Sequence, residues 1–179
     1  MIQAMNNFNF QNELQKLVES KKLIAVRFRS VPEEFKVAYI LNANSEFTTI
    51  AEITDTGGLD GVSIYPSDEI SSLGFKTEYL DELETKVDPS TLNRALANTA
   101  TVKDFSFKGF AAAFANTDTL VEVEYETDFR PFGKITGYDD EGLYLEECDD
   151  EFDTSLASFL IKFPAVQCMS LDIPYMREE

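Results

Sequence analysis

The feature of this 179-residue sequence that most constrains its fold is an internal repeat. Five residues of the N-terminal half occur again, unchanged, 97 positions later: Phe8, Phe10, Leu23, Val26 and Phe35 reappear as Phe105, Phe107, Leu120, Val123 and Phe132. Three more, Pro66, Ser72 and Leu73, reappear 98 positions later as Pro164, Ser170 and Leu171. Self-similarity at a nearly constant spacing is typical of a repeated structural unit. We therefore predict one unit present twice, with chance similarity between two ordinary β segments as the alternative.

Each copy is expected to contain a short helix followed by five strands. In the N-terminal copy, Leu14, Leu17 and Val18 fall at helical spacing within residues 11–21, which predicts an amphipathic helix. Alternating or continuous apolar runs then predict strands. They cover residues 23–29, 35–41, 47–53, 62–66 and 70–75. In the C-terminal copy, Phe129–Glu147 has the clearest pattern, two strands joined by a polar turn.

The segment between the copies has helical spacing. Apolar residues recur three or four positions apart among Asp and Glu, at Tyr79, Leu80, Leu83 and Val87, and they predict a helical connector. Five strands in about 70 residues usually curl into a small barrel that covers its own edges. The predicted fold class is mainly β (α+β), with two tandem five-stranded barrels, each preceded by a short helix. The predicted boundaries are residues 5–76 for the first barrel, 77–101 for the connector and 102–176 for the second barrel.

Two segments of the C-terminal copy resemble the motifs of the Sm-like branch of the SH3-like barrels. Gly133–Asp139 followed by Leu143–Leu145 is similar to the family's first motif, in which a glycine lets a strand bend and an acidic residue closes the turn. Leu160–Pro164 with Cys168–Leu171 is similar to the second motif, a strand, a tight break and a final strand. The resemblance implies a helix before five strands, and copies that associate through strand edges into rings.

The resemblance does not extend to the residues with which that family binds uridine. The place of the family's asparagine falls on Gly142, or on Leu143, and neither has a carboxamide to recognise a base edge. The family's Arg-Gly pair is replaced by Tyr65-Pro66 in the first copy and by Phe163-Pro164 in the second. The formal net charge of −18 also repels a phosphate backbone. Nucleic acid is therefore not an expected partner, because a shared fold does not carry function by itself.

The composition excludes several classes of function. The chain has no histidine, which rules out a histidine-based catalytic triad and a histidine metal site. Thr56–Gly61 is rich in glycine but lacks the Lys and Ser or Thr that follow in a Walker phosphate loop. The two cysteines, Cys148 and Cys168, favour free thiols in a reducing cytosol over a disulfide. No apolar stretch approaches the roughly 20 residues of a membrane span. We predict a cytoplasmic protein without catalytic residues, cofactor, metal or membrane contact.

The most acidic stretch is Asp139–Asp153, which contains nine carboxylates and no Lys or Arg. Hard cations prefer several oxygen ligands, so a calcium or magnesium site is an alternative there. The stretch lacks the Asp-x-Asp-x-Asp-Gly order that wraps one ion, and a solvated acidic surface is the expectation. Its first three acids, Asp139, Asp140 and Glu141, are candidate interaction residues.

Equivalent outward positions in the first strands of the two copies carry opposite charges. Arg27 and Arg29 in the first copy correspond to Glu124 and Glu126 in the second. If these faces meet, within one chain or between two, the charges would fix a register. The alternative is that both faces are solvated and unrelated. These four residues, with the acids of the turn, form the predicted interaction surface.

Strand edges are the second candidate surface. Val62–Tyr65 or Ser158–Phe163 could pair with another strand and join copies into a homo-oligomer, unless apolar residues on both faces bury Ser158–Phe163 completely. We predict a non-enzymatic protein-interaction or regulatory adaptor with an unidentified protein partner. The alternative is an RNA-associated protein that binds through the basic cluster Lys21, Lys22, Arg27 and Arg29. A third hypothesis is a nucleic-acid mimic whose acidic face, 139–153, occupies a partner's basic groove.

Overall fold

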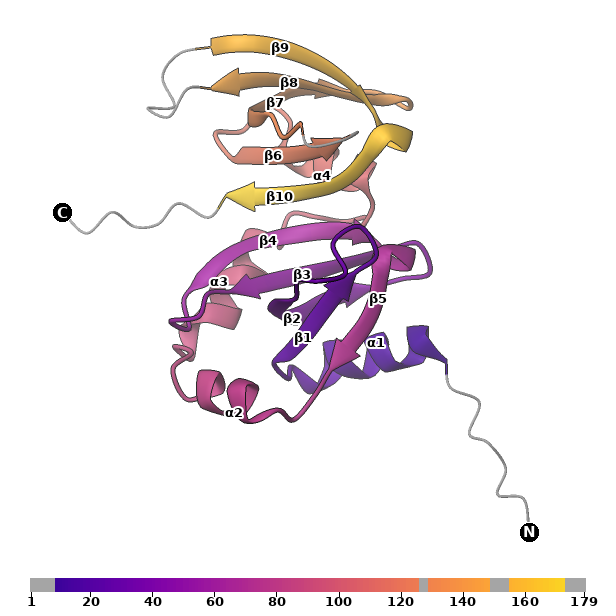
Figure 1. Ribbon diagram of the computed structural model, residues 1–179. Coiled ribbons are helices and arrows are strands. Elements are labelled where there is room, and N and C mark those ends of the chain that lie inside the picture. The colour runs from indigo at the N-terminus through magenta and orange to yellow at the C-terminus, as the bar shows by residue number, and fades with distance from the viewer. Residues whose placement is uncertain (1–8, 126–128, 149–154, 173–179) are drawn as a thin grey trace, which may run out of the picture.

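The ten strands that the structure describes all belong to one sheet. The computed structural model describes residues 9–125, 129–148 and 155–172 (Figure 1). The N-terminal half contributes α1 (Phe10–Ser20), β1 (Ile24–Phe28), β2 (Lys36–Ala43), β3 (Phe47–Ile53), β4 (Leu59–Pro66), η1 (Ser67–Glu69), β5 (Ile70–Gly74), α2 (Glu78–Glu84) and α3 (Ser90–Asn98). The C-terminal half contributes α4 (Phe107–Phe114), β6 (Leu120–Tyr125), β7 (Phe132–Tyr138), β8 (Gly142–Cys148), β9 (Ser155–Lys162), η2 (Phe163–Ala165) and β10 (Val166–Asp172).

The strand order in the sheet is β5-β1-β2-β3-β4-β10-β6-β7-β8-β9, and every neighbouring pair is antiparallel. β4 of the N-terminal half pairs directly with β10 of the C-terminal half. The prediction of two separate five-stranded barrels is therefore wrong, because the sheet is single, open and continuous across the two halves. The sequence pattern located the strands, but it carried no information on which strands pair across the halves.

The halves do share one strand order. Within the sheet, β5-β1-β2-β3-β4 is followed by β10-β6-β7-β8-β9, so each element of the first half has a counterpart at the same place in the second. Even the irregularities match: the β2–β3 ladder shifts register between Ile40 and Asn42, and the β7–β8 ladder between Ile135 and Gly137. A short 3-10 turn precedes the final strand of each half.

The ladders correct the spacing of the repeat. Val26 pairs with Leu73, and its counterpart Val123, 97 positions later, pairs with Met169. Leu73 therefore corresponds to Met169, 96 positions later, and not to Leu171 as the 98-residue spacing predicted. The spacing falls to 95 at Ile40 and Ile135, because the paired residues Ala25 and Val37 are 12 positions apart and the equivalent pair, Glu122 and Phe132, are only 10 positions apart.

Capping residues position the helices. Asn9 accepts a hydrogen bond from the backbone N–H of Asn12 at 3.2 Å, Thr77 from Leu80 at 3.1 Å, and Ser106 from Gly109 at 3.0 Å. Such caps satisfy N–H groups that the first helical turn leaves without a partner. The short helices predicted before each set of strands, and the helical connector, are confirmed as α1, α4 and the pair α2 and α3.

The apolar side chains form two clusters. The smaller cluster joins Leu14 and Leu17 of α1 to the first half of the sheet. The larger cluster runs through both halves: it includes Leu80, Leu83 and Ala95 of the connector helices and Phe110 of α4. Because this cluster is shared, we expect the two halves to unfold together. Among the residues that the structure describes, no helix is long and apolar enough to cross a membrane.

Candidate functional site

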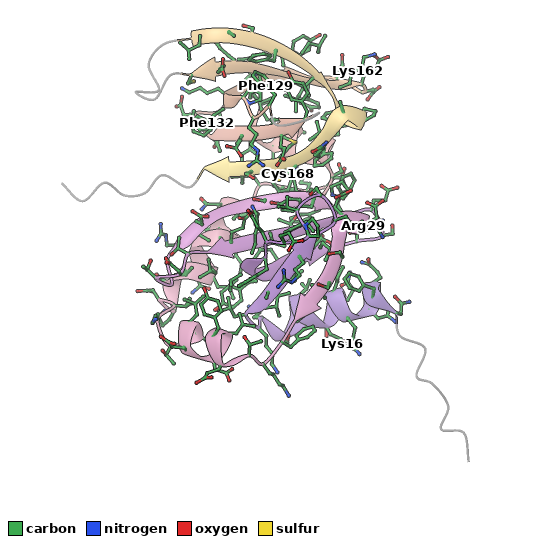
Figure 2. All side chains as sticks on the ribbon, viewed as in Figure 1. Lys16, Arg29, Phe129, Phe132, Lys162 and Cys168 are labelled. Atoms are coloured by element: carbon green, nitrogen blue, oxygen red, sulfur yellow. The ribbon has the colours of Figure 1, made fainter. Side chains whose placement is uncertain are left out.

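The most distinctive polar site lies where the halves join, along β4 and β10, and we call it the seam. Three hollows, of about 370, 240 and 110 Å³, open along it. Tyr65 and Glu124 line both the 370 Å³ and the 110 Å³ hollows, and Lys36 lines the 240 Å³ and the 110 Å³ hollows. Figure 2 shows Cys168 on β10, with Arg29 below it on the N-terminal half. Both halves thus supply walls to these hollows.

A hydrogen-bonded network centres on the carboxylate of Glu52, which is 8% exposed. It receives hydrogen bonds from Lys36 Nζ at 2.7 Å, from the Ser63 hydroxyl at 2.6 Å and from the Tyr65 hydroxyl at 3.2 Å. The Ser63 hydroxyl also lies 2.8 Å from the hydroxyl of Ser170 on β10, so the network crosses the seam. A buried carboxylate with three donors is well satisfied. The arrangement stabilises the junction and leaves Glu52 little freedom to act as a base.

Burial and charge shift the protonation of the groups around Glu52. Burial opposes the charged form of Lys36, but the nearby Glu52 carboxylate outweighs it, so the pKa of Lys36 is raised. Burial raises the pKa of Glu122, which lines the 240 Å³ hollow with Lys36 and Asp60. Its closeness to Glu124 adds to that rise, while Arg130 and Lys36 oppose it. Proton uptake by Glu122 is therefore favoured by folding.

Tyr65 and Cys168 form the apolar wall of the largest hollow. The Tyr65 ring lies 4.4 Å from the ring of Phe28, and the ammonium group of Lys36 lies 5.6 Å from the Tyr65 centroid. Burial raises the pKa of the Tyr65 hydroxyl well above its ordinary value and raises the pKa of the Cys168 thiol to about 12. Thiolate is the reactive form of cysteine, so Cys168 is unsuited to nucleophilic chemistry.

Of the four charged residues predicted to face one another, the structure describes Arg27, Arg29 and Glu124. Arg27 lies over the Phe35 ring at 5.4 Å and donates to the carbonyl of Pro32 at 3.3 Å. Arg29 and Glu124, which are not equivalent positions of the two copies, both line the largest hollow. Glu124, however, forms its ion pair with Arg130 at 3.0 Å. Glu126 lies outside the described residues.

The acidic turn between β7 and β8 is held by its own hydrogen bonds. Asp139 Oδ1 accepts from the backbone N–H groups of Glu141 at 2.8 Å and Gly142 at 3.0 Å. Asp140 pairs with Lys108, and the Glu141 carbonyl accepts from the Phe163 N–H at 2.9 Å. Within the described part of the chain, no group of three or more acidic or cysteine side chains is placed to hold a metal ion. The remainder of the acidic stretch, 149–153, lies outside the described residues.

The two ends of the sheet carry the open strand edges. Val62–Tyr65, one of the two predicted edges, is not free, because β4 pairs with β10. The other predicted edge, Ser158–Phe163, overlaps β9, which lies at the end of the described sheet and pairs with β8. Leu156 and Leu160 on β9 are 60% and 62% exposed, so β9 is not buried on both faces. At the opposite end, β1 is the one described strand that pairs with β5, and Phe75, which follows β5, is 46% exposed.

Sequence reasoning missed the seam network. The available signal was a polar residue inside each of three apolar strands: Glu52 in β3, Ser63 in β4 and Ser170 in β10. Polar groups at buried strand positions are expected to find partners. Nothing in the residue pattern indicates that these three residues would meet across the halves.

Comparisons were made with models of protein families, with curated proteins and with solved structures, and none of the three finds a match for this chain. The resemblance to the Sm-like family therefore remains a prediction from two sequence motifs.

Proposed function

We propose that this protein is a non-enzymatic, cytoplasmic protein-interaction module that binds its partner by strand addition at the outer edge of β9. The observation that supports this most is the exposure of Leu156 and Leu160 on β9, which has β8 as its one neighbour among the described strands. An open strand edge offers a row of backbone N–H and C=O groups, and exposed apolar side chains add affinity.

The chemistry of the seam supports the non-enzymatic part of the proposal. The Cys168 thiol stays protonated at neutral pH, since burial raises its pKa to about 12. Glu52 receives hydrogen bonds from three donors, and Lys36 is engaged by Glu52. A catalytic acid, base or nucleophile needs an unsatisfied, activated group within reach of a substrate. These groups instead stabilise the contact between the halves.

The test is to place a charge on the edge. Leu160→Lys adds an ammonium group to β9, and Tyr138→Lys is the matched control, since Tyr138 is 43% exposed but lies in β7, inside the sheet. Both variants and the unmodified protein are immobilised and exposed to native cytosol, and bound proteins are compared quantitatively. We expect Leu160→Lys to capture at least tenfold less of the partner than Tyr138→Lys captures. Equal capture by all three proteins would refute edge binding, and a turnover abolished by one seam substitution would refute the non-enzymatic assignment.

A further inference from the structure

The β4–β10 junction shows how this chain joins two strand edges. Four residue pairs face one another there: Ile64 and Met169, Ser63 and Ser170, Val62 and Leu171, and Gly61 and Asp172. Ile64, Met169 and Val62 are 0% exposed and Leu171 is 2% exposed. Alternate positions thus bury apolar side chains on one face, while the Ser63 and Ser170 hydroxyls meet on the other at 2.8 Å. The junction combines a backbone ladder with a dry apolar contact.

The strands equivalent to β4 and β10 are the two open edges of the sheet. Thr49 of β3 and Tyr144 of β8 are equivalent positions. Thr49 pairs with Ile64 and Tyr144 pairs with Leu160, so Leu160 of β9 is the counterpart of Ile64 of β4. Leu73 of β5 occupies the place of Met169, as the ladders to β1 and β6 show. Figure 1 shows β9 at the upper margin of the sheet and β5 at the margin of the N-terminal half. Each chain therefore carries one unused copy of each side of its own junction.

We propose that β9 of one molecule pairs with β5 of a second copy, antiparallel and in the register of the β4–β10 junction. This inference rests on the proposed function and names the partner at the β9 edge. Transferring the internal register places Leu73 opposite Leu160, Gly74 opposite Phe159, and Phe75 opposite Ser158. Leu160, 62% exposed in one chain, gains the apolar neighbour that Ile64 already has in Met169.

Side chains at the paired positions are compatible with this register. Leu73 and Leu160 supply one aliphatic cross-strand pair, and such pairs are a main source of sheet stabilisation. Gly74 has no side chain, so the Phe159 ring opposite can lie across it, an arrangement known to stabilise glycines in strands. Phe75, 46% exposed, lies beyond Gly74 and has the small Ser158 opposite.

The contact uses two different edges, so it is head-to-tail. Every molecule offers one β9 and one β5, and a heterologous contact of this kind closes into a ring or continues as an open chain of molecules. The formal net charge of −18 on each copy opposes association. Added salt screens this repulsion, so assembly should strengthen as ionic strength rises.

The register is tested by cross-linking in a Cys148→Ser background, which leaves the buried Cys168 as the one native thiol. Leu73→Cys/Leu160→Cys and Phe75→Cys/Ser158→Cys place cysteines at directly opposed positions, where Cα atoms about 4.5–5.5 Å apart allow a disulfide. Leu73→Cys/Ser158→Cys is the matched control, because diagonal neighbours lie about 7–8 Å apart. Leu160→Cys alone tests pairing of β9 with β9. After mild oxidation, products are separated on non-reducing gels, and light scattering gives the mass of the unmodified protein over a hundredfold concentration range.

We expect intermolecular disulfides from both opposed pairs, at least tenfold more than from the diagonal pair, and a mass that rises with concentration. Efficient dimers from Leu160→Cys alone would overturn the proposal, since they would show β9 pairing with itself. A monomer at every concentration, with no cross-linking in either opposed pair, would also overturn it. In that case the capture experiment with Leu160→Lys still decides the proposed function, because it reports a partner other than a second copy.

Discussion

The strongest test of this architecture compares Ile64→Ala with Leu160→Ala. The two residues occupy the same place in the two halves, but Ile64 is 0% exposed at the β4–β10 junction and Leu160 is 62% exposed at the open edge. Ile64→Ala removes three carbon groups from the largest cluster, a loss of about 2.4 kcal/mol at about 0.8 kcal/mol for each. A residual cavity adds to this, so we expect a total of about 3–4 kcal/mol. Leu160→Ala should cost no more than about 0.5 kcal/mol in the monomer.

The measurement is urea unfolding, at a protein concentration low enough to keep the chain monomeric. Because the largest cluster includes residues of both halves, we expect one transition with the same midpoint by tyrosine fluorescence and by far-UV circular dichroism. Ile64→Ala should move that single midpoint to a lower urea concentration with an unchanged slope. Equal effects of the two substitutions, or two separate transitions, would refute the view that the junction is part of one shared core.

Three further predictions concern Glu122 and Lys36 at the seam and Gly133 in β7. The pKa of Glu122 is raised in the folded protein, so the stability that its proton contributes is lost as pH rises through that pKa. Glu122→Gln should therefore raise the urea midpoint at pH 7. The variant should also gain less stability than the unmodified protein when the pH falls from 7 to 5. The pKa of Lys36 is also raised, so the stability that the charged lysine contributes is fully present below the pKa of Lys36 in the unfolded chain and is lost at alkaline pH. Lys36→Met should lower the urea midpoint at pH 7. It should also flatten the dependence of that midpoint on pH above pH 10. Gly133→Ala should destabilise the fold by more than about 1 kcal/mol, since its Cβ would lie 2.0 Å from the Glu146 carbonyl oxygen; an unchanged thermal midpoint would contradict this.

Local features of the fold could be predicted from the sequence because their causes are local. The helical spacing of Leu14, Leu17 and Val18 predicted α1, and it is confirmed. The motif that begins at Gly133 was expected to contain a glycine that lets a strand bend; what the structure shows at Gly133 is a steric need for glycine, because a Cβ there would lie 2.0 Å from the Glu146 carbonyl oxygen. Asp139 was predicted to close the turn, and its two backbone hydrogen bonds confirm that.

The spacing of the repeat was less reliable than its existence. The identical residues Phe35 and Phe132 suggested that these positions are equivalent. Ala25 and Glu122, 97 positions apart, are equivalent residues of β1 and β6. Ala25 pairs with Val37 and Glu122 pairs with Phe132, so the ladders make Val37 the counterpart of Phe132. The connection between these paired positions is two residues shorter in the C-terminal half, which shifts the true counterpart of Phe132 from Phe35 to Val37. Residue identity cannot detect such a shift when the replaced residue is also apolar.

The way in which the halves join could not be predicted, for a physical reason. The backbone groups at a strand edge can form the same hydrogen bonds whatever the side chains are. The sequence of β4 therefore does not determine whether its partner strand lies in the same half, in the other half or in another molecule. Side-chain pattern constrains only which faces must be covered. Ile64 and Leu160 are both aliphatic and occupy equivalent places, yet one is fully buried and the other is exposed. The exposed leucine at the edge retains the chemistry of a junction that the chain has already built once, and this supports a second copy as the partner of β9.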